Sequence, residues 1–222
     1  MSKQQNTAQS NVGCGTGRIV GCRFSLYPMS DQFVSIILDA IAETNTSKVW
    51  HQSDNISTCV RGKMNHVFNV VQSIYQHAAS SKQHVVITAS FSIGCPGDTT
   101  GDSYMEVDDV LCNEVSYDQD AKAQFALYPL GEVNYMDTIY SAMDIAEKKG
   151  TFAGGVHYAS QLQGEISKIF DTLHEVFQST TKETNHVVMT TTIGCNSPSS
   201  HPSHSENSSH SQQATSEKKG EL

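Results

Sequence analysis

A repeated segment constrains the fold of this chain more than any other feature. The sequence FSLYP at residues 24–28 returns as FALYP at 125–129, and QHVVITASF at 83–91 returns as NHVVMTTTI at 185–193. The copies are 101 residues apart at the first match and 102 at the second. We expect this one-residue difference near the turn between the second and third strands. Chance rarely preserves order, spacing and residue type over such a length, so the chain contains two copies of one unit.

Each copy predicts the same succession of strand, helix, strand, strand, helix and strand. Phe33, Ile36 and Ala40 recur at helical spacing in the first copy, as Met136 and Ile139 do in the second. This βαββαβ order is that of a ferredoxin-like unit, a four-stranded antiparallel sheet with both helices on one face. The predicted fold class is therefore α+β, with two such units in tandem. The predicted elements are 19–28, 31–43, 47–53, 56–61, 64–79 and 84–93 in the first copy, and 123–129, 134–149, 151–156, 158–163, 166–180 and 186–194 in the second.

The last strand of the first copy has an apolar side and a mixed side. The apolar side must pack under the helices, because side chains alternate between the faces of a sheet. The mixed side is too apolar to face water alone and too polar for a core, so we expect a sheet-to-sheet contact that holds a site. The apolar side consists of Val85, Ile87, Ala89, Phe91 and Ile93, and the mixed side of Val86, Thr88, Ser90 and Ser92.

Charge and cysteine content narrow the class of protein. The net charge of −9 argues against a nucleic-acid surface, which requires clustered lysine and arginine. The N-terminal stretch has no apolar segment of a signal peptide, and no run approaches the ~18 apolar residues of a membrane span. The six cysteines form no CxxC pair and are expected to be reduced thiols. We therefore expect a cytoplasmic protein.

Segments poor in apolar residues separate the two copies and flank them. Between residues 96 and 122, eight acidic side chains stand against Lys122 alone. The C-terminal stretch is rich in serine and histidine and has no apolar period, which is typical of disorder. The expected organisation is a disordered N-terminus at 1–17, a first domain at 18–95, an acidic connector at 96–122, a second domain at 123–196 and a disordered tail at 197–222.

Several of these segments together resemble the YkoF family of thiamine- and hydroxymethylpyrimidine-binding proteins, which are linked in bacteria to an importer of the pyrimidine half of thiamine. They are GCRFSLYPM, TSKVW, NISTCVRG, QHVVITASFSIGCPGDTTGD, QFALYP, GVHYAS and NHVVMT, and the resemblance covers roughly residues 18–198. It implies a homodimer that stacks the sheets, one pyrimidine-type site per domain, and a membrane transporter complex as a further partner. The acidic connector and the tails match the family least.

The residues that could hold an aminopyrimidine follow from the shape of that ring, which is apolar on its faces and polar at its edges. The first strand of each copy ends in Leu-Tyr-Pro, and proline has no N–H with which to continue a ladder. We therefore expect the main-chain groups of Leu26 and Leu127 to meet the edge of the ligand, with a plain strand exit as the alternative. Tyr27 and Tyr128 could line the same cleft or a dimer contact.

Hydroxyl, indole and imidazole side chains complete the set of candidates. Thr58 aligns with Ser160, and a hydroxyl can both donate to and accept from a ring edge. Trp50 is a candidate stacking plate, although a core role is common for a lone tryptophan. The second copy has Thr151 or Phe152 there, so we expect two unequal sites. Weaker candidates, for which capping or exposure is the alternative, are His84 and His186 at strand starts and Ser90 and Thr192 on the mixed side.

Other functions remain open at this level. A regulatory module of the ACT type would share the fold and sense another small molecule, and an accessory subunit would use its sheet face to bind a protein. Catalysis is not expected, because only Cys59 with His51 or His84 could form a nucleophile and base, and no spacing supports either pair. We expect neither a cofactor nor a metal, since the histidines at 201, 204 and 210 lie in the tail.

Overall fold

The chain forms an α+β fold built from two repeats, as the sequence predicts. A computed structural model describes residues 19–94, 102–114 and 117–200, so the predicted disorder of residues 1–17 and the histidines of the tail lie outside the described residues. The first repeat comprises β1 (Val20–Pro28), α1 (Phe33–Ala42), β2 (Trp50–Ser53), β3 (Thr58–Gly62), α2 (Met64–Ala79) and β4 (Val85–Ile93). The second comprises β5 (Asp120–Pro129), α3 (Tyr135–Lys148), β6 (Phe152–Val156), β7 (Ala159–Glu165), α4 (Ile166–Glu183) and β8 (Val187–Cys195).

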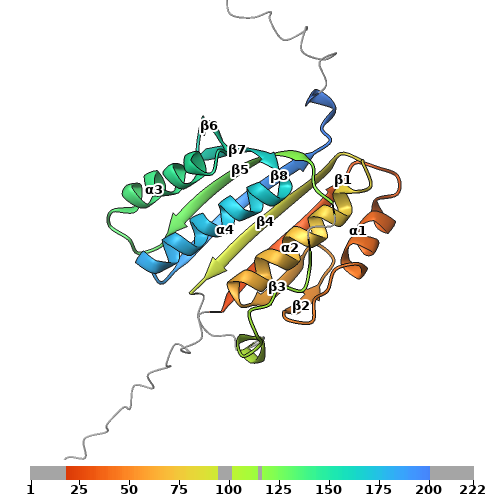
Figure 1. The fold of residues 1–222 in the computed structure, drawn as a ribbon, viewed down its shortest axis with the longest axis horizontal. Helices are drawn as coiled ribbons and strands as arrows, with labels where there is room; N and C mark the ends of the chain where they lie inside the picture. Colours follow the sequence, from red (N-terminus) through yellow and green to blue (C-terminus); the bar gives the residue numbers. More distant parts are fainter. Residues whose placement is uncertain (1–18, 95–101, 115–116, 201–222) are drawn as a thin grey trace, which may run out of the picture.

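The two repeats share one antiparallel sheet, which the sequence did not indicate. Its eight strands run in the order β2-β3-β1-β4-β8-β5-β7-β6, and all four helices cover one face (Figure 1). The sheets join where β4 pairs with β8 over nine residues, from Val85 with Cys195 to Ile93 with Val187. Because each last strand is the edge of its own repeat, this pairing satisfies two edges that would otherwise be open.

An approximate twofold axis passes through the joint between β4 and β8. At the middle of the ladder Ala89 pairs with Thr191, and these two residues are the same position of the repeat, 102 residues apart. Both side chains are buried on the helix face. The Thr191 hydroxyl donates to the Gln124 carbonyl at 3.0 Å, so the polar member of the pair is satisfied.

Aromatic side chains from both repeats form the core above this joint. Phe68 of α2 stacks on Phe91 of β4 with ring centroids 4.1 Å apart, and it lies 5.9 Å from Phe177 of α4. The Tyr75 hydroxyl lies within hydrogen-bond distance of the carbonyls of Val85 and Ile193, at 3.2 and 3.3 Å. Burial raises the pKa of this phenol. The apolar side of β4 is buried under the helices as predicted, and its mixed side faces away from them.

The offset between equivalent residues of the two repeats changes from 101 to 102 earlier in the chain than the sequence suggested. The buried positions of the first helices are Ile36 and Ala40 in α1 and Thr138 and Ala142 in α3, each pair 102 residues apart. The extra residue of the second repeat therefore lies in the loop between β5 and α3, and not near the turn between the second and third strands. Phe33 is half exposed and does not belong to the core stripe.

Residues 102–114 of the connector lie against the first repeat. It contains a short 3₁₀ helix, η1 (Asp102–Met105), and Lys48 and Lys63 form ion pairs with Asp108 and Asp109. The His66 ring nitrogen Nε2 lies 2.7 Å from the Asp108 carbonyl oxygen. Strand β5 then begins at residue 120, three residues before the predicted start. No helix in the described part of the chain combines the length and apolar character needed to cross a lipid bilayer.

Candidate ligand-binding cleft

A cleft opens between α3 and the sheet, where β5 extends past the end of β7. Its volume is about 570 Å³, and its walls come from the ends of β5 and β7, one side of α3 and the β6–β7 turn. Most lining side chains are apolar or aromatic, which suits a flat ring with apolar faces. The residues on the β5 and β7 side include Phe125, Leu127, Pro129 and Ser160, and those on α3 include Tyr135, Met136, Ile139, Tyr140 and Met143.

Among the residues that the structure describes, the main chain of Leu127 has no strand partner on the side that faces this cleft. The Leu130 N–H donates to the His186 carbonyl at 2.8 Å, so alternate residues of β5 turn their main-chain groups toward β8. Leu127 is three residues from Leu130, so its main-chain N–H and C=O point to the other side of the strand, toward β7. The β5–β7 ladder ends at the pair Phe125 and Ser160, two residues before Leu127. One N–H and one C=O therefore point past the end of β7, and a ligand edge can satisfy both.

The predicted reason for these free groups is wrong. Proline does not stop the ladder, because Pro129 still pairs with Val187 and Pro28 with Val85. The groups are free because the neighbouring strand is shorter than the first strand of the repeat.

Ser160 adds a hydroxyl to the same cleft. It pairs with the buried Phe125, so its side chain lies on the helix face of the sheet, two residues from the buried Leu162. Its other cross-strand neighbour is Gly155, which has no side chain to compete for the hydroxyl. The structure thus brings together Leu127, Tyr128 and Ser160 of the predicted site residues.

The β1–β3 ladder of the first repeat ends in the same way, with different side chains. Thr58 pairs with Phe24 at the last position of the β1–β3 ladder, and Leu26 lies two residues beyond it. The next partner of Leu26 would be Ile56, but the Ile56 main chain is occupied elsewhere. Its N–H donates to Asp54 Oδ1 and its carbonyl accepts from Ser25 Oγ, both at 2.8 Å.

The two hydroxyls differ in their surroundings. Thr58 Oγ1 lies 2.8 Å from Ser53 Oγ, whereas Gly155 stands at the position equivalent to Ser53. A ligand in the first repeat therefore meets a hydroxyl that already has one partner.

Trp50 does not share a pocket with Thr58. Trp50 pairs with Arg61, whose side chain lies on the open face, while Thr58 lies on the buried helix face. A ligand held by Thr58 cannot stack on an indole across the sheet, so Trp50 and Thr58 cannot contact the same ligand. In the second repeat, Thr151 lies at the position equivalent to Trp50. The Thr151 carbonyl accepts from the N–H of Gln163, and Gln163 is the counterpart of Arg61.

Ser90, Thr192 and the two histidines lie outside the cleft lining. Ser90 and Thr192 project from the open face, opposite to Leu127. The carbonyls of His84 and His186 accept from Met29 and Leu130, each at 2.8 Å, so both histidines extend a ladder by one bond. The ring of His84 lies near Gly194 on the open face. Tyr27 and Tyr128 are each about half exposed on that face, and Tyr128 also borders the cleft.

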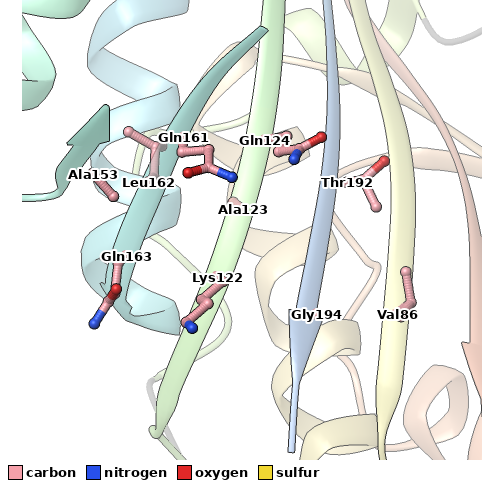
Figure 2. Close-up of a pocket in the computed structure, with 10 residues that line it drawn as sticks. All are labelled: Val86, Lys122, Ala123, Gln124, Ala153, Gln161, Leu162, Gln163, Thr192 and Gly194. Atoms are coloured by element: carbon pink, nitrogen blue, oxygen red, sulfur yellow. The ribbon is translucent and has the colours of Figure 1, made fainter. Parts of the chain in front are cut away.

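The open face carries a second hollow above Gly194 (Figure 2). Because Gly194 has no side chain between Val86 and Lys122, a depression of about 510 Å³ forms there. Figure 2 shows the amides of Gln124 and Gln161 over neighbouring strands at its upper end. Amides can bind the edge of an aminopyrimidine, but the lining of this depression contains no aromatic side chain to stack on a ring.

Sequence reasoning missed the residues of α3 and its entry loop. Glu132 borders the cleft as the acidic residue of its rim, and Tyr135, Met136 and Tyr140 are 41 to 57% exposed. The sequence did contain a signal for them. The apolar residues of α3 cover a wider face than a helix needs to pack on a sheet, so some of them were free to line a site.

Of the two nucleophile and base pairs considered, the structure separates Cys59 from His51. His51 pairs with the buried Val60, whereas Cys59 lies on the opposite face, so these two side chains are separated by the sheet. Among the described residues, no group of three or more histidine, cysteine, aspartate or glutamate side chains could hold a metal ion.

Comparison with known proteins agrees with this architecture. The pattern of the YKOF-related Family matches residues 19–98 and 120–200, which are the two repeats. The chain belongs to this family. It is also 51% identical over 189 residues to a Bacillus subtilis (strain 168) protein named "Putative HMP/thiamine-binding protein YkoF", an alignment that covers 84% of this chain and 94% of that protein.

Proposed function

We propose that this chain binds thiamine or its hydroxymethylpyrimidine precursor reversibly and without chemistry, at one cleft in each repeat. The main-chain groups of Leu127, which are free inside an apolar cleft, carry this proposal. An aminopyrimidine places an amino donor beside a ring-nitrogen acceptor, and a free C=O and N–H on one residue match that pair. The name of the Bacillus relative supports the same ligand class.

The walls of the cleft suit the remainder of the ligand. The ring would lie between the apolar side chains of β5 and those of α3, with the Ser160 hydroxyl at one edge. Thiamine also carries a fixed positive charge on its thiazolium ring. Glu132 at the rim and the exposed face of Tyr135 or Tyr140 can stabilise that cation by charge and by cation–π attraction.

The two clefts are expected to bind with different affinities. The second repeat has Tyr135 and Tyr140 where the first has Phe33 and Leu38, and Ser160 has no hydroxyl neighbour equivalent to Ser53. Fewer aromatic side chains and a partnered hydroxyl favour weaker binding in the first repeat.

Titration calorimetry tests the proposal directly. Thiamine and hydroxymethylpyrimidine should each produce heat with two classes of site, and a panel of amino acids should produce none. Heat with an amino acid alone would favour a sensor of the ACT type, and no heat with either pyrimidine would refute the proposal.

The open face of the sheet supports a second, structural part of the proposal. Two chains would stack these faces in a homodimer, because Val86, Tyr27 and Tyr128 leave apolar surface beside polar groups. A role beside a membrane transporter would follow from the ligand. Sedimentation of the purified chain gives the mass that distinguishes a dimer from a monomer.

A further inference from the structure

The turn between β6 and β7 places an aromatic side chain at the mouth of the second cleft. Tyr158 lies in the two-residue turn between Val156 and Ala159, and it borders the cleft. Its side chain is 99% exposed, the highest value among the large hydrophobic residues of the described chain. An aromatic ring of this size buries apolar area in most folded proteins, so its complete exposure has no explanation in the stability of the free protein.

The main chain of Tyr158 is also in an unfavourable conformation. Its φ angle is 69°, in the left-handed region that a bulky residue seldom adopts. Glycine or asparagine usually occupies such a turn position, because each adopts positive φ at little cost. Strain of this kind tends to persist where it serves a function.

The position of Tyr158 in the ladder connects it to the ligand groups. The β5–β7 pairs run from Asp120 with Glu165 to Phe125 with Ser160, so the next main-chain partner of Leu127 along this register would be Tyr158. The turn at Tyr158 takes its main chain out of the sheet at this point. The same residue thus leaves the main chain of Leu127 without a strand partner and borders the cleft that contains these free groups.

The first repeat has a large apolar side chain at the same position. Ile56 precedes Thr58 by two residues, as Tyr158 precedes Ser160, and it is 84% exposed. Its turn is held by Asp54, whose Oδ1 accepts from the N–H groups of Ile56 and Ser57 at 2.8 Å. The two turns therefore differ in their hydrogen bonds, but each leaves an apolar side chain exposed at the equivalent position.

We propose that Tyr158 is a specificity-determining residue of the second cleft, whose ring closes over a bound aromatic ligand and stacks on its outer face. This inference rests on the proposed function and adds the residue that selects a flat ring. Ile56 would cover the ligand of the first cleft by apolar contact alone. Binding would bury the exposed ring of Tyr158 and so offset the cost of its turn.

The substitution Tyr158→Asn separates this role from a structural one. Asparagine accepts positive φ, so the unliganded variant should unfold at a temperature about 2–4 °C higher than the wild type. Loss of stacking should weaken thiamine binding roughly tenfold at one of the two classes of site. Tyr158→Phe should bind like the wild type, because the ring remains. Val133→Asn is the matched control, since Val133 is 89% exposed and lies outside the cleft lining.

Calorimetry with thiamine and thermal unfolding without ligand give both readouts. Opposite changes in stability and affinity for Tyr158→Asn support the proposal. Unchanged affinities at both classes of site overturn it, and so does a parallel loss of stability and affinity, which indicates a structural residue. A wild-type chain that gives no heat with thiamine refutes the proposed function itself, a result distinct from either.

Discussion

Phe125 and Ser160 form the last pair of the β5–β7 ladder, and β5 continues for four more residues to Pro129. This difference in strand length creates the cleft, because the helix face of β5 then has α3 above it and no strand beside it. The same relationship holds for Phe24 and Thr58 in the first repeat. The repeat therefore duplicates the strand-end arrangement from which the cleft beside α3 arises.

Removing either hydroxyl should weaken binding at its own cleft. Ser160→Ala should lower the affinity of one class of site by about five- to tenfold, the value of one net hydrogen bond. Thr58→Val should affect the other class, by a smaller factor because Thr58 already interacts with Ser53. Calorimetry with thiamine measures both. Thr192→Val, on the open face, is the control, and an equal loss in that variant would contradict the assignment.

Replacing Trp50 should leave thiamine binding unchanged. The indole lies on the open face, whereas Thr58 lies on the helix face, so Trp50→Phe removes no contact to a ligand in the cleft. The affinities for both classes of site should stay within twofold of the wild type in calorimetry. A loss of affinity at one class of site alone would indicate that the ligand of the first repeat lies on the open face, which contradicts this prediction.

Gly94 should tolerate alanine far less than Gly131 does. Both residues have positive φ, at 89° and 84°, so they share the strain of about 1–2 kcal/mol that alanine adds in this region. A Cβ on Gly94 would lie only 2.3 Å from the main-chain oxygen of Asn185, while a Cβ on Gly131 would meet nothing within 4 Å. We expect Gly94→Ala to lower the free energy of unfolding by at least ~2 kcal/mol more than Gly131→Ala. Urea denaturation gives both values, and equal losses would disprove the close approach between the repeats.

Asp54 should make stability depend on acid pH. Hydrogen bonds from the N–H groups of Ile56 and Ser57, together with Arg23, lower the pKa of Asp54 to about 2. A carboxyl with a lowered pKa in the folded state stabilises that state above its ordinary pKa near ~4, and this contribution disappears as the pH falls toward 2. Asp54→Asn keeps an oxygen acceptor for the turn and loses the charge.

The melting temperatures of the wild type and Asp54→Asn measure this contribution. The difference between them should be greatest above pH 5 and shrink as the pH falls. A difference that stays constant between pH 6 and pH 3 would show that the charge of Asp54 contributes nothing.

The repeated segments and the alternation of apolar residues were enough to predict the equivalent strands and the buried face of β4. FSLYP and FALYP marked equivalent strands, and the alternation in β4 correctly assigned Val85 and Ile87 to the buried face. The pairing of β4 with β8 was not predictable in this way, because an edge strand that pairs and one that stays open carry the same alternation. The residues of α3 were missed for a related reason, since an exposed Tyr140 and a buried Ala142 both fit an apolar helical pattern.

The main-chain amide of Leu127 provides the most direct test of the central claim. This N–H should exchange rapidly with solvent deuterium in the free protein, because it points past the end of β7. Thiamine should slow its exchange by at least tenfold, while the Tyr128 amide, which faces β8, should be protected in both states. NMR detection of hydrogen exchange resolves the two amides. Unchanged exchange at Leu127 under conditions where calorimetry shows thiamine bound would contradict the account.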